Sequence, residues 1–401
     1  MLRSFVFGLS HFKGSLLSKM SVGWHMRRAL LPTLISALIC LLLGACGTLA
    51  AGSTPPPPLT PSRVFPSPSL PVLVSPSPSP LPSRSPTPSR SVSPSALPPG
   101  YYRNPVLDHD FPDPEALQVG DTYYAFSTNS GDENIQTARS NDLVHWELLG
   151  DALPKLPSWA VQDFGWAWAP GLAKPVGYNA YLMYFTARFA MGYGGIQCIG
   201  VAQSQEPSGP YQPQGANPFI CQHDEGGSID AAYFADEDGS EYLLWKSDAN
   251  SHGGSPDIFI QRLSADGLTL EGDPVLLISV DQRWEGTVIE GPVLWQRDGK
   301  YFLFYSANNY ASPDYAIGYA VADSPTGPYT KASEPLLKTI LSAGIVGPGG
   351  EEVVTGPDGD TWMLFHTWTP GAYRALALAK LDWEGDTPVI RSLTRDAMPA
   401  P

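Results

Sequence analysis

The sequence predicts an all-β fold, a five-bladed β-propeller, for residues 101–401. Aromatic-rich β segments recur there at spacings of 58, 61, 59 and 61 residues, and their centres are Tyr123, Tyr181, Tyr242, Tyr301 and Trp362. Further apolar runs such as QCIGVAQS and DIFIQRL follow them, with glycine-containing turns between and no convincing amphipathic helix. Repeats of about 60 residues, each a small antiparallel sheet, are typical of propeller blades. A long β-sandwich is the competing fold, but it gives no reason for the even spacing.

The N-terminal segment, residues 1–46, has the layout of a signal peptide. Residues 27–46 read RRALLPTLISALICLLLGAC: two arginines, a short apolar run and small residues before Cys46. The LGAC end resembles a bacterial lipobox, in which the cysteine is acylated, so we expect a lipid anchor at Cys46 and a location at the cell surface. An ordinary secretory signal is the alternative. Because residues 1–25 are longer than a usual leader start, we expect Met26 to be the true start.

The next segment, residues 47–100, is predicted to be a disordered linker. From residue 51 onward it consists almost entirely of Pro, Ser, small and aliphatic residues, with no Asp, Glu or Lys. Such a composition offers too little clustered apolar surface to offset the cost of ordering the backbone. At about 3.1 Å per residue in polyproline II form, the linker could reach on the order of 150 Å. It would hold the folded domain away from a membrane or through a cell wall.

Charge is concentrated in the predicted propeller and excludes some partners. Residues 101–401 contain all 39 acidic residues and 16 of the 24 basic ones, which gives a net charge of −23. A surface this acidic repels phosphate backbones and anionic lipid. We therefore expect no nucleic-acid partner, a neutral substrate, and membrane contact only through the lipid anchor.

Cysteine usage agrees with export. Cys40 lies in the apolar run of the signal, and Cys46 is the expected lipidation site, which leaves Cys198 and Cys221 in the propeller. In an oxidising compartment such a pair is predicted to form a disulfide. The alternative is two buried free thiols.

Carboxylates recur at a fixed place in the repeat. Stepping back ten to twelve residues from each aromatic centre gives, in order, Asp113, Pro170, Asp230, Glu290 and Glu351. In a propeller the innermost strand of each blade lines the central channel, so the first, third and fourth repeats should bring Asp113, Asp230 and Glu290 to its mouth. Glycoside hydrolysis needs one carboxylic acid as proton donor and one carboxylate to activate water, and a third acid nearby can raise the donor's pKa. We interpret Glu351 as a loop residue.

Five segments, in order, resemble glycoside hydrolase family 43: NPVLDHDFPDPEALQVGDTYYAFST, WAWAPGLAKP, GSIDAAYFADEDGSEYLLW, IEGPVLWQRDGKYFLFYS and GPGGEEVVTGPDGDTWMLFHTW. The resemblance covers roughly residues 104–395 and implies a five-bladed propeller that cleaves arabinose- or xylose-containing polysaccharide with inversion. It implies that Asp113 is the general base, Glu290 the general acid, and Asp230 the residue that orients the acid and tunes its pKa. Arg374 would contact the sugar in the catalytic subsite.

The chain departs from the family pattern at three places. Gly171 follows the WAP motif, Ala231 follows Asp230, and Gly347–Gly350 lacks the histidine that helps many members to hold a central cation. We therefore expect that no cofactor is required, and leave open a structural calcium or sodium. His366 is a candidate in the substrate site, with a packed strand histidine as the alternative.

Aromatic side chains near the predicted channel mouth are candidates for stacking on a sugar. Trp168, in the WAP segment, is the first choice, and Phe111 and Trp284 are further candidates. The run His223–Glu225 lies just before the third motif. We interpret it as a solvated loop held by Cys221, with a metal site as the alternative, so the metal remains unknown.

Together these observations predict an exported, lipid-anchored or secreted, inverting glycosidase. The expected activity is that of an exo-acting α-L-arabinofuranosidase or β-D-xylosidase on plant cell-wall polysaccharide or its oligosaccharides. An endo-α-1,5-L-arabinanase is the alternative within the class, and a non-catalytic carbohydrate-binding propeller is the alternative outside it. A fructan-acting propeller is disfavoured because the motifs typical of that group are missing.

Overall fold

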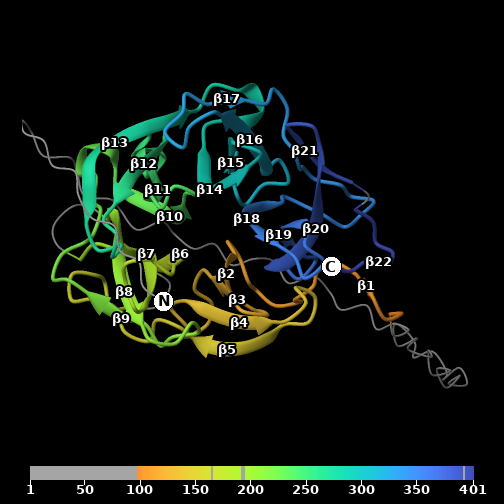
Figure 1. Cartoon of the computed structure of the whole chain (residues 1–401), viewed down its shortest axis with the longest axis horizontal. Coiled ribbons are helices and arrows are strands. Elements are labelled where there is room, and N and C mark those ends of the chain that lie inside the picture. Colours follow the sequence, from red (N-terminus) through yellow and green to blue (C-terminus); the bar gives the residue numbers. More distant parts are fainter. Residues whose placement is uncertain (1–96, 164–165, 191–194, 392) are drawn as a thin grey trace, which may run out of the picture. The chain divides into compact units, whose positions relative to one another are not determined.

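Five four-stranded antiparallel sheets, arranged in a ring, form the domain in this computed structural model (Figure 1). The structure describes residues 97–401 except 164–165, 191–194 and 392. The predicted signal peptide, the lipidation site Cys46 and nearly all of the predicted linker lie outside the described residues. The five-bladed all-β prediction is confirmed. In the described part, no helix is long and apolar enough to span a membrane.

The blades follow one another along the chain, and each runs from its innermost to its outermost strand. Blade 1 consists of β2 (Glu115–Val119), β3 (Thr122–Ser127), β4 (Gln136–Ser140) and β5 (Glu147–Asp151). Blade 2 consists of β6 (Ala167–Ala173), β7 (Tyr181–Arg188), β8 (Gln197–Ser204) and β9 (Gln212–Gln214). Blade 3 consists of β10 (Ser228–Ala235), β11 (Glu241–Ser247), β12 (Asp257–Leu263) and β13 (Leu270–Ser279).

The last two blades follow the same plan. Blade 4 consists of β14 (Ile289–Arg297), β15 (Lys300–Ala307), β16 (Ala316–Ala322) and β17 (Thr330–Lys331). Blade 5 consists of β18 (Gly349–Thr355), β19 (Thr361–Trp368), β20 (Arg374–Glu384) and β21 (Thr387–Ile390). Helical structure in the described residues is confined to three short 3-10 turns, η1 (His223–Glu225), η2 (Ala249–His252) and η3 (Arg283–Glu285).

The second strand of every blade is buried on both faces, and this explains the aromatic-rich repeat in the sequence. Successive side chains of a strand point to opposite faces. On β15, Phe302 and Phe304 pack toward blade 5, while Leu303 and Tyr305 pack toward blade 3. Each of the five apolar clusters fills the space between two neighbouring blades. A strand between two such clusters must be apolar throughout, as all five repeat centres show.

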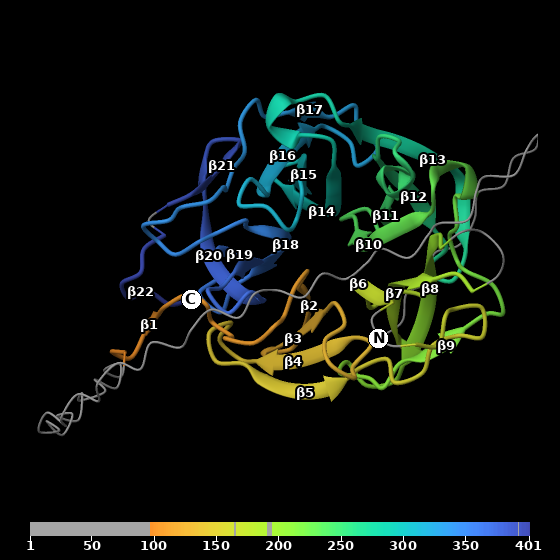
Figure 2. The same ribbon diagram turned by 180° about the vertical axis from the view of Figure 1, so that it is seen from behind.

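The ring closes between blades 5 and 1 through a segment ahead of the first blade. The strand β1 (Tyr101–Tyr102) pairs with β22 (Met398–Pro399), and the two lie beside blade 5 (Figure 1; Figure 2). The side-chain amide of Asn104 donates to the carbonyl of Leu378 on β20 at 2.8 Å, and its oxygen accepts from the Leu378 N–H at 2.8 Å. These bonds hold the chain just ahead of Asp113 against the last blade.

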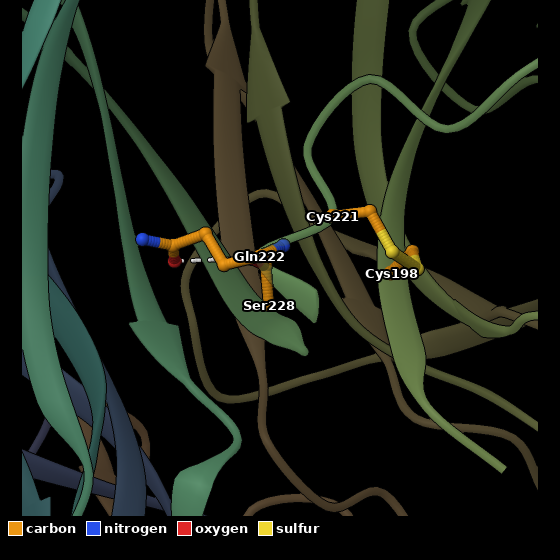
Figure 3. Close-up of a disulfide and its surroundings, with 4 residues drawn as sticks. All are labelled: Cys198, Cys221, Gln222 and Ser228. Atoms are coloured by element: carbon orange, nitrogen blue, oxygen red, sulfur yellow. Dashed lines mark hydrogen bonds between the residues drawn. A yellow bond between two sulfur atoms is a disulfide. The ribbon is translucent and has the colours of Figure 1, made fainter. Parts of the chain in front are cut away.

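A disulfide joins Cys198 on β8 to Cys221 in the loop that leads to β10 (Figure 3). The next residue, Gln222, accepts hydrogen bonds from the hydroxyl of Ser228 at 3.1 Å and from the indole N–H of Trp245 at 2.6 Å. The start of β10, the strand that carries Asp230, is thereby tied to blade 2 and to its own blade.

Candidate active site

One residue near the channel in each blade has a left-handed backbone conformation. These residues have φ of 52°, 42°, 54°, 58° and 55° and are, in blade order, Asp113, Ala169, Asp230, Gly291 and Gly350. In blades 2 to 5 they coincide with a β-bulge in the innermost strand. Left-handed backbone is unfavourable for most side chains, although aspartate tolerates it better than most. Such conformations concentrate at functional sites.

This common position corrects the carboxylate register predicted from the sequence. Asp113 and Asp230 occupy the left-handed position itself, whereas Glu290 comes one residue before it and Glu351 one residue after it. Equal spacing along the chain therefore did not mean equal side-chain direction. Glu351 is 3% exposed and its carboxylate accepts from the Ser306 hydroxyl at 2.6 Å, so it is a buried strand residue of β18 and not a loop residue.

The three predicted catalytic acids line one cavity of about 490 Å³ at the channel. Its wall also includes Trp168, Arg374 and several side chains that the sequence reading did not select, namely Thr128, Lys246, Asp248, Asn250, Tyr310 and Tyr315. The structure thus brings Asp113, Asp230 and Glu290 together, as the repeat predicted.

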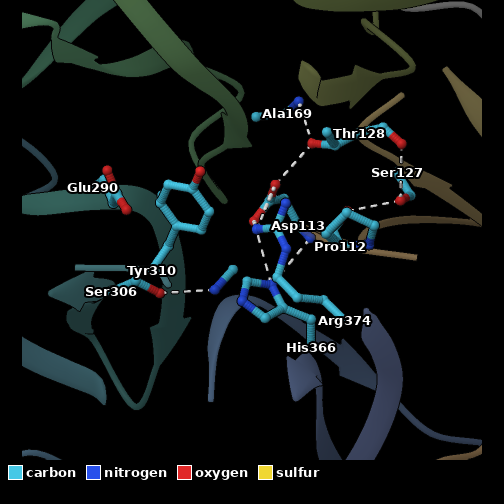
Figure 4. A network of polar contacts seen from close by, with 12 residues as sticks. Pro112, Asp113, Ser127, Thr128, Ala169, Glu290, Ser306, Tyr310, His366 and Arg374 are labelled. Carbon is cyan, nitrogen blue, oxygen red and sulfur yellow. Dashed lines mark hydrogen bonds and ion pairs between the residues drawn. The ribbon is translucent and has the colours of Figure 1, made fainter. Parts of the chain in front are cut away.

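Asp113 is held by partners from blades 1 and 5 (Figure 4). Its carboxylate accepts from the Thr128 hydroxyl at 2.7 Å and from the Arg374 guanidinium at 3.1 Å. Its backbone N–H donates to Nδ1 of His366 at 3.1 Å. Burial alone would raise the pKa of Asp113, but the Arg374 cation and the neighbouring hydrogen bonds hold that pKa well below its usual range. Asp113 is therefore an ionised carboxylate at neutral pH.

Asp230 and Glu290 form a second group of acids with opposite electrostatics. Burial raises the pKa of Asp230 to about 7; the Lys246 cation opposes this shift, whereas Glu290 and Asp113 add to it. Glu290 accepts from the Tyr315 hydroxyl at 2.8 Å and from the Lys246 ammonium at 3.1 Å. Near pH 7 Asp230 can therefore hold a proton that Asp113 cannot.

Two of the predicted sugar contacts lie in the cavity. Trp168 occupies the residue before the left-handed position in blade 2, the place that Glu290 has in blade 4. Arg374, at the start of β20, lies 5.1 Å from the ring centroid of Tyr310, which is 51% exposed. Tyr310 is thus an aromatic surface at the cavity that the sequence reading missed, because it sits in a loop with no repeat pattern.

The other three predicted substrate contacts are wrong. Phe111 is completely buried in the core between blades 5 and 1. Trp284 stacks on Tyr305 at 5.8 Å and lines a different cavity, beside Asn308. His366 is also completely buried, beneath Asp113, and burial lowers its pKa so that it stays neutral. Apolar packing fixes Phe111 and Trp284, and stacking on Tyr315 fixes His366 in β19, although all three lie close to a motif in sequence.

Side chains that commonly bind metal ions do not gather into a cluster in the described residues. Within residues 97–401 as described, no set of three or more His, Cys, Asp or Glu side chains could hold a metal ion. His223–Glu225 forms the turn η1, and these residues are exposed. No step proposed below uses a metal.

Comparison with known proteins decides the family. The profile of the family described as Glycosyl hydrolases family 43 matches residues 102–388. The chain belongs to this family. It is 30% identical to the Beta-D-galactofuranosidase xynD of Aspergillus niger over 66% of this chain and 75% of that protein. It is 28% identical to a putative beta-xylosidase of Xylanibacter ruminicola over 73% of this chain and 50% of that protein.

A solved structure of a thermostable family-43 glycoside hydrolase has the same fold, with a TM-score of 0.66. The two are 35% identical, and the match covers 75% of this chain and 99% of the other. The resemblance to family 43 and the assignment as a glycosyl hydrolase are therefore confirmed. The chain spans only half the length of the Xylanibacter relative.

Proposed function

We propose that this family 43 protein is an inverting, exo-acting glycosidase that removes α-L-arabinofuranosyl or β-D-xylosyl residues from plant cell-wall polysaccharide. The proposal rests on one observation, that acids lining the same cavity have different charge states. Asp113 is held as a carboxylate by Arg374, while burial favours the protonated form of Asp230, which interacts with Glu290. Inverting hydrolysis needs one acid in each of these states.

The proposed reaction is a single displacement. Asp113 accepts a proton from a water molecule whose oxygen forms a bond to the anomeric carbon from one face. The bond from that carbon to the leaving oxygen breaks on the other face, and Glu290 transfers its proton to that oxygen. Asp230 interacts with Glu290 and disfavours its ionisation, because two charged carboxylates at one site repel each other. Solvent then removes the proton from Asp113 and returns one to Glu290.

The cavity supplies groups that can hold the sugar. Arg374 contacts Asp113 at 3.1 Å and lines the cavity, so it can bind a sugar hydroxyl while it keeps the base ionised. Trp168 and Tyr310 offer aromatic faces of the kind that pack against the apolar side of a sugar ring. We assign these three side chains to substrate binding.

The names of the relatives support two classes of sugar. One relative is a putative beta-xylosidase, and another acts on β-D-galactofuranosides. The ring of β-D-galactofuranose has the same configuration as that of α-L-arabinofuranose, and the two sugars differ in the substituent at C4. A furanoside substrate is therefore consistent with both the family resemblance and this relative. An endo-arabinanase and a non-catalytic binding propeller remain the competing functions.

The proposal includes the place of action. The signal-like residues 27–46, the lipobox-like Cys46 and the Pro/Ser-rich segment support export and a lipid anchor. A net charge of −23 on residues 101–401 suits a neutral polysaccharide and disfavours nucleic acid. We propose no required cofactor.

The test is hydrolysis by the full chain of aryl α-L-arabinofuranoside, β-D-xyloside and β-D-galactofuranoside, with debranched arabinan alongside. We expect turnover of an aryl glycoside, and a loss of about 10²- to 10⁴-fold in Glu290→Gln with unchanged thermal unfolding. Glu237→Gln, an exposed acid in the turn between β10 and β11, is the matched control. Activity on arabinan alone would replace the exo proposal by the endo one. Activity that survives in Glu290→Gln would refute the role of Glu290.

A further inference from the structure

A lysine is buried among the acids of the cavity. Lys246 lies near the end of β11 and is 1% exposed, yet its ammonium belongs to the cavity wall. Its Nζ lies 3.1 Å from Oε2 of Glu290 and 3.8 Å from Oδ1 of Asp248. A buried cation is costly unless carboxylates surround it. Burial lowers the pKa of Lys246, but Glu290, Asp230 and Asp248 outweigh that effect and raise it, so the ammonium stays charged.

The charges around Glu290 indicate that the Lys246 ammonium offsets the negative charge of neighbouring acids. The titratable groups that face Glu290 or interact with it come from blades 1, 3, 4 and 5 and are Asp113, Asp230, Lys246, Asp248, Tyr315, Glu351 and His366. Arg374 neutralises Asp113, and His366 is neutral. Lys246 is then the cation for Asp230, Asp248 and Glu290. Three acids with no cation would hold their protons too tightly to release one.

The geometry also fixes the direction of the Glu290 carboxyl. Oε1 accepts from the Tyr315 hydroxyl at 2.8 Å and Oε2 accepts from Lys246, so the group is held from two sides. Tyr315 is itself fixed, because its ring stacks on His366 at 5.8 Å. Removing Lys246 would free one side of the carboxyl and leave the tyrosine contact in place.

We propose that Lys246 is the positioning residue of the proton donor: its buried ammonium orients Glu290 and offsets the surrounding negative charge, so that Glu290 can release its proton to the leaving oxygen. This inference rests on the proposed function. Lys246 acts through Glu290 and need not touch the substrate.

Two consequences separate this role from a merely structural one. Proton donation matters most when the leaving group is a poor one, so loss of Lys246 should impair turnover of an alkyl glycoside or oligosaccharide far more than that of a dinitrophenyl glycoside. Loss of the cation should also disfavour ionisation of Glu290, because a nearby positive charge stabilises the ionised form. The basic limb of the activity profile, the pH range over which activity falls as the proton donor ionises, would then move to higher pH.

The test compares Lys246→Met with Lys246→Arg and with Lys331→Met. Lys331 is a matched control: its side chain is 5% exposed and lies 2.7 Å from the buried Glu285 in blade 4, outside the cavity. For Lys246→Met we expect an oligosaccharide rate at least tenfold more impaired than the dinitrophenyl rate, and a basic limb raised by on the order of one pH unit. Lys246→Arg keeps the positive charge, so the basic limb of its pH–activity profile should lie at the same pH as in the wild type. Lys331→Met should lower only the melting temperature.

Equal losses on both substrates with an unmoved basic limb would overturn the inference, and so would a Lys331→Met variant with the same pH shift. Should Lys246→Met fail to fold, the Lys246→Arg variant provides the test. The role is supported if its rate on the oligosaccharide falls no more than its rate on the dinitrophenyl glycoside. The role is contradicted if the basic limb of its pH–activity profile moves. If the wild type hydrolyses neither substrate, the proposed function itself has failed.

Discussion

Asp113 and Asp230 show how the same backbone position can give two charge states. Both aspartates have the left-handed conformation of the residue that faces the channel, with φ of 52° and 54°. They differ in their neighbours: Arg374 and Thr128 stabilise the charge on Asp113, while Asp230 interacts with both Lys246 and Glu290. The shared left-handed conformation accounts for the position of both aspartates, and the surrounding residues account for their different charge states.

Asn250 offers a residue-scale test of substrate recognition. It lies in η2, after β11, and lines the cavity, but its Oδ1 is buried with no hydrogen-bond partner among the described residues. An unsatisfied buried acceptor costs about 1–3 kcal/mol, which a sugar hydroxyl would recover on binding. We predict that Asn250→Ala lowers kcat/KM by about 5- to 100-fold without a change in melting temperature. Asn217→Ala, at an exposed loop position, is the control, and a loss below twofold in Asn250→Ala would remove this role.

At the residue scale the sequence predicted that the three acids converge, whereas two of the three aromatic candidates lie outside the cavity. The acids were predictable because three carboxylates recur ahead of the repeat centres. Phe111 and Trp284 could not be assigned, because both lie outside the strands, where the repeat spacing does not fix the direction of a side chain. Lys246 did carry a signal that was missed: it is a charged residue at the end of the apolar run YLLW, where a lysine needs buried partners.

At the scale of single elements, the second strand of each blade allowed the fold to be predicted from the sequence. It is apolar on both faces, so its aromatic-rich run stands out in the sequence five times. The innermost strands are less regular, since a β-bulge interrupts the alternation in four of them. Within this bulge Asp230 is the left-handed residue, whereas Glu290 comes one residue before it, and a repeat length alone does not reveal this difference.

The innermost strands of the first and last blades also carry a pair of buried glutamates. Glu115 on β2 and Glu352 on β18 share a hydrogen bond, and burial raises the pKa of Glu115 to about 7 and that of Glu352 well above its usual value. A raised pKa means that the folded state binds the proton more tightly than the unfolded chain does. The stability that this proton provides is complete below about pH 4.5 and is lost as pH rises through about 7.

We therefore predict that Glu352→Gln stabilises the domain at pH 8, by on the order of 1–3 kcal/mol, and changes little at pH 4.5. Glutamine can keep the hydrogen bond to Glu115 without adding a second negative charge. Chemical denaturation of both proteins at the two pH values measures the difference, with Glu237→Gln as the exposed control. A variant less stable than the wild type at pH 8 would show that this carboxyl pair is not protonated in the folded state.

At the scale of the whole molecule, the ring brings together residues that are far apart in the sequence. Asp113 and Arg374 are 261 positions apart and lie 3.1 Å from each other. They meet because β1 pairs with β22 and Asn104 binds β20, so that blade 5 is fixed beside blade 1. The sequence predicted the number of blades, since that follows from a count of repeats. How the ring closes left no repeat signal, because β1 and β22 are two residues long.

If Asp113 activates water and Glu290 donates the proton, the glycoside is hydrolysed in a single inverting step. The most direct measurement is proton NMR of the first anomer released, before mutarotation, from whichever aryl β-D-xyloside or α-L-arabinofuranoside the full chain cleaves. Inversion at the anomeric carbon predicts α-D-xylose from the β-D-xyloside, or β-L-arabinose from the α-L-arabinofuranoside. First release of the anomer with retained configuration would contradict it, because retention requires a carboxylate nucleophile and a covalent intermediate.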